Sequence, residues 1–188
     1  MTICAAILAG GQGRRMGGDK HRAVLGQRSL LEHVIARVEA QAEALALSGD
    51  HVSLAESGHL VLPDYAHLSG PSAGLMSALQ WACQRAQALL TVPCDMPFLP
   101  VTLASDLAGG SVTVPVLDTR PIWTIAYWPQ PCLAEGLAFF DSLDAGAAPP
   151  LCAVYEALSV RLMDVADAQA FTGINTPSAL EEAEQSCA

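Results

Sequence analysis

Residues 2–8 form a short apolar run that ends at a glycine-rich segment, and this junction constrains the fold more than any other part of the sequence. The segment Ala9–Gly18 holds five glycines in ten residues. A buried strand that leads into such a loop leaves backbone N–H groups free to surround an anion. Basic residues concentrate here too: five of the nine in the chain lie between residues 14 and 28, although the formal net charge is −10. The pattern indicates a small-anion site, with an ordinary solvated loop as the alternative.

Strand-like and helix-like segments alternate along most of the chain. Apolar runs predict strands at residues 44–47, 59–62, 89–92, 112–114, 122–127 and near 160–163. Helical spacing and capping residues predict helices at about 29–40, after 69–71, at 100–108, at 131–143, after the loop 144–150, and from Thr176–Pro177 onward. This alternation predicts one α/β domain over residues 1–188, a Rossmann-like three-layer sandwich whose mostly parallel sheet has helices on both faces. Ligands of such folds bind beyond the carboxyl ends of the strands.

The acidic balance and the cysteine pattern argue against several classes of protein. A net charge of −10 disfavours nucleic acid or an anionic membrane as a partner, since both require a basic surface. The longest apolar runs, such as Ala86–Pro93, are far shorter than the roughly 20 residues of a membrane span. The six cysteines are irregularly spaced without a CxxC pair, and residues 1–8 lack the basic start of a secretion signal. We therefore expect a cytoplasmic protein.

The glycine-rich segment fits neither of two widespread nucleotide-binding motifs. A GxGxxG fingerprint requires glycine where Met16 stands, and a P-loop requires lysine directly after glycine, whereas Asp19 separates Gly18 from Lys20. The segment instead resembles the signature of the molybdenum cofactor guanylyltransferases, and later stretches resemble that family's other motifs in the same order. The matching stretches are residues 8–20, residues 62–64 followed by 69–74, residues 92–98 (VPCDMPF) and residues 171–177 (FTGINTP).

This resemblance implies a nucleotidyltransferase with the nucleotide-diphospho-sugar transferase fold, with a nucleotide half at about residues 1–100 and an acceptor half at about 101–188. The family transfers GMP from GTP to the phosphate of molybdopterin and releases pyrophosphate. The attacking phosphate oxygen is already ionised near neutral pH, so the reaction requires charge neutralisation and alignment rather than a general base. Expected partners are GTP, the molybdenum cofactor and, transiently, cofactor-insertion proteins. The expected metal is Mg²⁺, with Mn²⁺ as a substitute, and the expected state is a monomer.

The resemblance also assigns roles to individual residues. Arg15, Lys20 and Asp95 are expected to be catalytic, because the two cations offset triphosphate charge and the carboxylate holds Mg²⁺. The expected nucleotide-binding residues are Leu8, Ala9, Gly10, Gly11, Gly13, Lys20, Asp64 and Asp95. The expected acceptor-binding residues are Ser72, Gly74 and Asn175. Each set has a local structural alternative: turns for the aspartates and glycines, helix capping for residues 72 and 74, and a position beside a helix N-cap for residue 175.

The chain departs from the family pattern mainly in its second half. Gly173 stands where the family usually has asparagine, residues 145–150 lack a common arginine pair, and residues 48–50 lack an asparagine. From Glu135 onward nine acidic residues stand against one basic residue, Arg161. Two alternatives therefore stay open: a relative that uses CTP or another acceptor, and a nucleotide-binding regulatory protein with weak or no turnover. Residues 8–11 (LAGG) favour guanine, since the cytidylyl relatives typically read LAAG there.

Two further groups of residues carry no site in this interpretation. His51, His59 and His67 recur every eight residues, but they fall on different predicted elements, so we expect no metal site there. Aromatic residues at 123, 127 and 128 fall on or beside one predicted strand, and we expect them to belong to the core rather than to a stacking platform.

Overall fold

Eight strands of the described chain form one central sheet, and a separate hairpin holds two more. The structure is a computed structural model that describes residues 2–10, 16, 20–85 and 87–187. The order along the sheet is β10-β7-β9-β6-β1-β4-β5, with β8 paired to β7. The sheet strands are β1 (Ile3–Leu8), β4 (Ala44–Ser48), β5 (Leu60–Leu62), β6 (Ala88–Pro93), β7 (Thr113–Leu117), β8 (Arg120–Pro121), β9 (Ala126–Trp128) and β10 (Arg161–Asp164). The hairpin consists of β2 (Val24–Leu25) and β3 (Arg28–Ser29).

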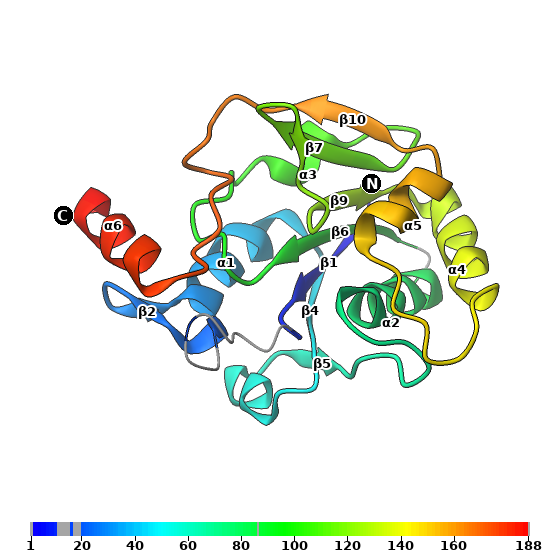
Figure 1. Cartoon of the computed structure of the whole chain (residues 1–188), viewed down its shortest axis with the longest axis horizontal. Coiled ribbons are helices and arrows are strands. Elements are labelled where there is room, and N and C mark those ends of the chain that lie inside the picture. The colour runs from blue at the N-terminus through cyan, green and yellow to red at the C-terminus, as the bar shows by residue number, and fades with distance from the viewer. Residues whose placement is uncertain (1, 11–15, 17–19, 86, 188) are drawn as a thin grey trace.

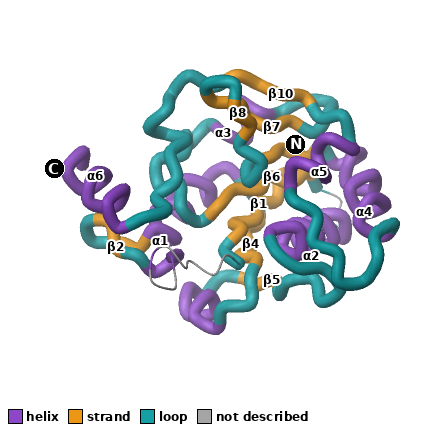
Figure 2. The backbone as a smooth tube through the Cα atoms, viewed as in Figure 1, coloured by secondary structure: helices purple, strands orange, loops and turns teal. Residues whose placement is uncertain are grey.

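Helices cover both faces of the sheet, which confirms the predicted three-layer sandwich (Figures 1 and 2). One face carries α1 (Leu30–Val38) and α3 (Leu103–Leu107). The other face carries α2 (Pro71–Gln84), α4 (Leu133–Asp141) and α5 (Leu151–Ala157). The last helix, α6 (Pro177–Cys187), packs against the β2–β3 hairpin through a small separate cluster that includes Leu25 and Ala183. Short 3₁₀ turns lie at Lys20–Arg22, Glu39–Gln41, Val52–Ser57 and Gln130–Cys132.

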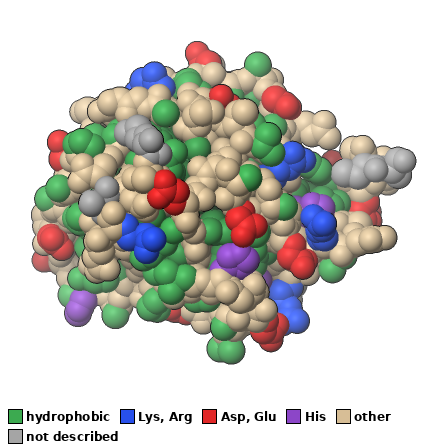
Figure 3. Space-filling model, turned by 180° about the vertical axis from the view of Figure 1, so that it is seen from behind, with side chains coloured by type: hydrophobic (Ala, Val, Ile, Leu, Met, Phe, Trp, Pro, Cys, Tyr) green, Lys and Arg blue, Asp and Glu red, His purple; other side chains and the backbone are tan. Residues whose placement is uncertain are grey.

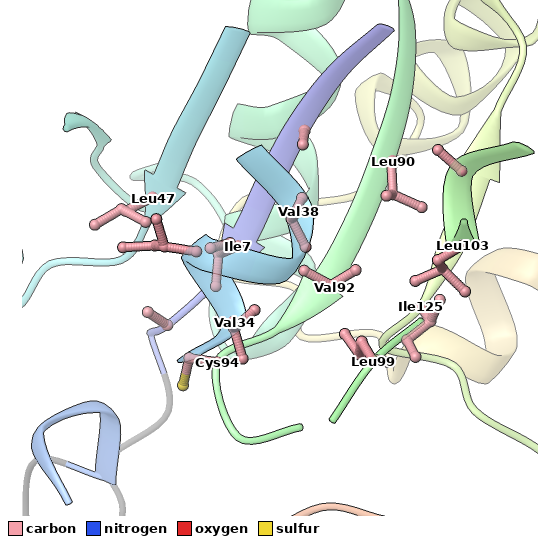
Figure 4. Close-up of a cluster of buried hydrophobic side chains, with 14 of the residues drawn as sticks. Ile7, Val34, Val38, Leu47, Leu90, Val92, Cys94, Leu99, Leu103 and Ile125 are labelled. Atoms are coloured by element: carbon pink, nitrogen blue, oxygen red, sulfur yellow. The ribbon is translucent and has the colours of Figure 1, made fainter. Parts of the chain in front are cut away.

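Local sequence explains where α1 begins and what it covers. Ser29 Oγ accepts a hydrogen bond from Glu32 N at 3.2 Å, and the Glu32 carboxylate accepts one from Ser29 N at 2.7 Å, which together form a capping box. Val34 and Val38 then pack beside Ile7 of β1 in the larger buried cluster (Figure 4). This packing holds β1 in the middle of the molecule, directly before the glycine-rich segment.

The structure corrects two predictions about individual elements and adds one element that was not predicted. The strand predicted at 122–127 covers Ala126–Trp128 and lies antiparallel to β6 and β7, because a turn closed by an Ile125 N to Ile122 O bond of 2.9 Å precedes it. The helix predicted at 100–108 is the shorter α3, because a turn over residues 100–103 comes first. The β2–β3 hairpin was not predicted at all. Tyr127 and Trp128 are fully buried, as expected, and Trp123 is partly buried.

No helix in the described ranges is both long and apolar enough to cross a bilayer. Acidic and basic side chains lie scattered among apolar and uncharged surface on the face opposite to that of Figure 1 (Figure 3). Cys4, Cys83, Cys94, Cys132 and Cys152 are free.

The register of the parallel strands aligns four carboxyl ends in one row. Leu8 of β1 pairs with Ser48 of β4 and with Pro93 of β6, and Ser48 pairs with Leu62 of β5. Strand β7 is antiparallel to β9, which is antiparallel to β6, so β7 also points the same way. The segments after these strands therefore meet at one edge of the sheet, where ligands of α/β folds bind.

Candidate active site

A cleft of about 1010 Å³ opens at this edge of the sheet. Segments that follow β1, β4, β5 and β6 supply much of its wall, together with the amino end of α2. Of the predicted site residues, the cleft is lined by Leu8, Gly10, Lys20, Asp64, Gly74, Asp95 and Asn175. Gly11, Gly13 and Arg15 lie outside the described residues. The structure thus brings together predicted residues that are far apart in the sequence, such as Leu8 and Asn175, which are about 170 positions apart.

Lys20, Asp95 and Asn175 form one contact cluster in the cleft. The Lys20 Nζ group donates to Asp95 Oδ2 and to Asn175 Oδ1. The Lys20 and Asp95 side chains are 17% and 10% exposed, so the ion pair is largely shielded from water. Ile174 N donates to the Asp95 backbone oxygen at 2.8 Å, which ties the segment before α6 to the loop after β6. A cation and a carboxylate held this way can engage the charges of a polyphosphate.

The turn that carries Lys20 is anchored by the residue that follows it. His21 is only 2% exposed, and its Nε2 lies 2.8 Å from Ser53 Oγ. Its ring also lies 5.2 Å from the ring of His51, which lines the cleft. These contacts hold the turn beside the cleft, and sequence reasoning missed His21 because no local pattern shows that a lone histidine after Lys20 is buried.

Gly173 lies close to the ends of two site side chains, and its backbone conformation is not one reserved for glycine. A Cβ atom at this position would lie 2.8 Å from Asn175 Nδ2 and 3.1 Å from Asp95 Oδ2. Asn175 Nδ2 also donates to the Gly173 oxygen at 3.2 Å. The departure from the family's usual asparagine thus allows residues 173–175 to lie directly against the Asp95 carboxylate.

Asp64 places a buried carboxylate oxygen in the cleft. Its Oδ1 is buried and has no hydrogen-bond partner among the described residues. Burial raises the pKa of this carboxyl above its usual value, the nearby Asp50 raises it further, and His51 partly offsets both effects. Asp50 Oδ1 accepts a hydrogen bond from Asp64 N at 2.9 Å and so orients the loop. Unpaired buried acceptors are costly, so Asp64 is well suited to receive donors from a ligand.

Two glycines make room for the Asp64 carboxylate. A Cβ at Gly10 would lie 2.9 Å from Asp64 Oδ2, and a Cβ at Gly74 would lie 3.3 Å from Asp64 Oδ1 and 2.8 Å from Ser48 Oγ. Ser48 Oγ in turn donates to the Gly74 oxygen at 3.1 Å. A side chain at Gly10 would therefore require the Asp64 carboxylate to shift, and one at Gly74 would require Ser48 Oγ to shift and would crowd the carboxylate.

Two predicted residues lie behind the cleft rather than on its wall. Ala9 is 1% exposed, and its N–H donates to the Ser48 oxygen at 2.8 Å. Ser72 is buried, and its hydroxyl donates to the Pro149 oxygen, so it neither lines the cleft nor caps α2. Asp50, His51, Met96 and Thr124 line the cleft but were not predicted as site residues. Asp50 and His51 lie just after β4, so their position after a parallel strand could have identified them from the sequence.

Asp95 offers one carboxylate for a divalent metal. No group of three or more His, Cys, Asp or Glu side chains in the described ranges is arranged to hold a metal ion. Mg²⁺ is commonly bound through one or two carboxylates together with substrate phosphates and water, so the donors present fit that ion with a bound triphosphate. The neighbouring Cys94 is not a thiolate, because burial raises the pKa of its thiol to about 12.

Comparison with known proteins places these features in one family of proteins. Residues 5–159 match the model of the MobA-like NTP transferase domain. A molybdenum cofactor guanylyltransferase of Acidiphilium cryptum is 38% identical over 186 residues, covering 96% of this chain and 93% of that protein. One from Cereibacter sphaeroides is 39% identical over 191 residues, covering 98% and 96%. The crystal structure of molybdopterin-guanine dinucleotide biosynthesis protein A from Archaeoglobus fulgidus shares the fold, with a TM-score of 0.73 at 22% identity over 98% of both chains.

Proposed function

The chain belongs to the molybdenum cofactor guanylyltransferase family and is a nucleotidyltransferase, and from this premise we propose that it transfers GMP from GTP to the terminal phosphate of molybdopterin. The observation that carries the proposal is one cleft lined both by the contact cluster of Lys20, Asp95 and Asn175 and by Asp64, whose Oδ1 atom has no hydrogen-bond partner among the described residues. The cluster suits a polyphosphate, and the carboxylate suits a base with adjacent donors.

Asp64 would select the base. Guanine presents a ring N–H and an exocyclic amino group on one edge, and a buried carboxylate can accept from both. Cytosine lacks that pair of donors and would leave the Asp64 Oδ1 atom unpaired, which costs roughly 1–3 kcal/mol. The close approach of Gly10 and Gly74 to the carboxylate would keep its oxygens aimed at the base.

Lys20 and Asp95 would act on the phosphates. An oxygen of the acceptor phosphate forms the new bond to the α-phosphorus of GTP, and the bond from that phosphorus to the pyrophosphate oxygen breaks. Since the acceptor phosphate is ionised near neutral pH, no residue has to remove a proton from it. Lys20 would offset the negative charge that repels the two phosphates, and Asp95 would hold Mg²⁺, which supplies further charge neutralisation when bound.

The remaining features of the proposal follow from the same premise. We keep the following as predictions: Mg²⁺ as the metal with Mn²⁺ as a substitute, a cytoplasmic location, a monomeric state, transient transfer of product to cofactor-insertion proteins, and the division into a nucleotide half and an acceptor half. The alternative is a protein that uses CTP, and the test of base selection must distinguish it from one that uses GTP.

Calorimetry with GTP, CTP and ATP in the presence of Mg²⁺ tests the proposal. We expect GTP to bind at least about tenfold more tightly than CTP, as one unpaired buried acceptor implies. Asp64→Asn should abolish that preference, whereas Asp141→Asn, which removes an exposed carboxylate on α4, should leave it unchanged. Equal affinity of the parent protein for GTP and CTP would refute guanine selection.

A further inference from the structure

A second cavity, of about 620 Å³, adjoins the cleft at the hairpin between β7 and β8. Thr124 lines both cavities, so they are neighbours at the same end of the molecule. The wall of the second cavity comes from the hairpin, from the turn before β9, and from Phe171, which lies four residues before Asn175. In Figure 1, the hairpin region around β7 lies beside the long connection that leads from β10 to α6. A molecule that reacts beside Asp95 can therefore extend past Thr124 into this second cavity.

The tip of the hairpin presents a cation that has no side-chain partner in the described part of the chain. Leu117 pairs with Arg120 across a two-residue turn in which Asp118 and Thr119 have φ of 46° and 65°. Aspartate tolerates the left-handed conformation, whereas it is uncommon for a β-branched residue such as Thr119, and such outliers are enriched at functional sites. Arg120 lines the cavity, is exposed, and forms no ion pair or side-chain hydrogen bond with any described residue.

An aromatic ring lines the same cavity as this cation. Trp123 lines the cavity and is stacked on Tyr155, with ring centroids 5.8 Å apart and ring planes inclined by 14°. Tyr155 is fully buried, so its packing fixes the orientation of the Trp123 ring. A fixed aromatic wall beside a guanidinium is suited to a flat heteroaromatic ring whose edge carries hydrogen-bond acceptors or negative charge.

No other basic residue of the second half of the chain reaches either cavity. Arg120 and Arg161 are the only basic residues after position 100. Arg161 lies on β10, donates to Thr113 Oγ1 at 3.2 Å and lines neither cavity. The segment 144–150, which carries no basic residue, is held against residues 67–69 by backbone bonds such as Gly146 N to His67 O at 2.7 Å. Positive charge for the acceptor's far end is thus available only from Arg120 among the described residues.

We propose that the second cavity binds the ring end of the acceptor, a flat heteroaromatic phosphate monoester, with Trp123 against the ring and the Arg120 guanidinium on its electron-rich edge. This inference rests on the proposed function for the identity of the acceptor as a pterin. The reacting phosphate lies at the other end, beside Lys20 and Asp95. Arg120 is a specificity-determining residue that does not touch the nucleotide.

The test compares Arg120→Gln with Arg85→Gln, which removes an exposed arginine directly after α2, at the end of the sheet where β6 begins. We expect Arg120→Gln to raise the KM for a pterin phosphate acceptor about tenfold or more, as loss of a charge-assisted hydrogen bond implies, with the KM for GTP unchanged. Trp123→Leu should have an effect of the same kind. Arg85→Gln should change neither constant.

Three binding probes separate this inference from the proposed function. Affinity for 6-hydroxymethylpterin phosphate and for unphosphorylated 6-hydroxymethylpterin should fall by the same factor in Arg120→Gln, while competition by inorganic phosphate stays unchanged. Weakened phosphate binding with normal pterin binding would overturn the inference, as would an unchanged acceptor KM. If GMP transfer were absent but pterin binding still depended on Arg120, the proposed function would fail while this inference held.

Discussion

Replacing Lys20 by methionine should weaken the fold as well as the reaction, because the substitution leaves the Asp95 carboxylate without its cation. Losing one partner of a fully buried ion pair costs about 3–5 kcal/mol, whereas an exposed pair contributes about 0–1 kcal/mol. The two side chains are 17% and 10% exposed and lie on the wall of an open cleft, so water reaches the orphaned carboxylate in part. We therefore expect Lys20→Met to lower the free energy of unfolding by about 1–3 kcal/mol.

The double variant Lys20→Met/Asp95→Asn separates stability from catalysis. Removing the orphaned charge should restore the free energy of unfolding to within about 1 kcal/mol of the parent value. GMP transfer should stay at least about a hundredfold below the parent rate in both variants, since neither can neutralise phosphate charge. The assay is urea unfolding followed by circular dichroism at pH 7, run beside measurement of pyrophosphate release.

An exposed ion pair serves as the matched control. Arg22 and Glu56 are 3.8 Å apart with side chains 58% and 69% exposed, so Arg22→Met should cost no more than about 1 kcal/mol. The reasoning fails if Lys20→Met is no less stable than Arg22→Met, or if the effects of the Lys20 and Asp95 substitutions simply add.

Three further predictions concern the glycines and the base-binding carboxylate. Gly10→Ala should displace the Asp64 carboxylate and reduce the preference for GTP over CTP, whereas Gly110→Ala, whose Cβ would meet nothing within 4 Å, should leave the calorimetric ratio unchanged. Gly173→Asn introduces the family's usual residue. It should lower turnover, because its Cβ would meet the Asp95 carboxylate. A variant more active than the parent would contradict this packing argument. Because the pKa of Asp64 is raised in the folded state, its ionisation costs stability as the pH rises from the ordinary value of 3.8 through the raised pKa. In urea unfolding, the free energy of unfolding of Asp64→Asn should therefore rise relative to that of the parent as the pH increases from about 3.8 to 7. A difference in stability between the two proteins that does not change with pH would contradict this prediction.

Much of the architecture follows from local sequence signals. Ser29 and Glu32 form the capping box that starts α1, and Thr176 Oγ1 accepts from Ala179 N at 3.2 Å at the start of α6, as its position before Pro177 predicts. The direction of β9 does not follow, because an apolar run specifies burial and not whether a strand runs parallel or antiparallel to its neighbours. The β7–β8 turn does not follow either, since Thr119 adopts a left-handed conformation that sequence rules assign to glycine.

The candidate site, too, could be predicted only in part from the sequence. Placement of Asp64 and Asp95 follows from their positions directly after strands, and Lys20 follows from its place in the family motif. The contact of Lys20 with Asn175 joins residues 155 positions apart and depends on how α6 packs, which no local pattern encodes. Ser72 illustrates the converse. Its place near the start of α2 suggests an anion contact, but its hydroxyl donates to the Pro149 oxygen.

Product formation from labelled GTP tests the central claim most directly. The protein is incubated with GTP labelled at the α-phosphate, molybdopterin and Mg²⁺, and the products are separated and identified by mass spectrometry. We expect label to appear in a pterin–guanine dinucleotide, with one pyrophosphate released per dinucleotide and at least about tenfold less product from CTP. Label that stays in GTP, or equal product from CTP, would contradict it.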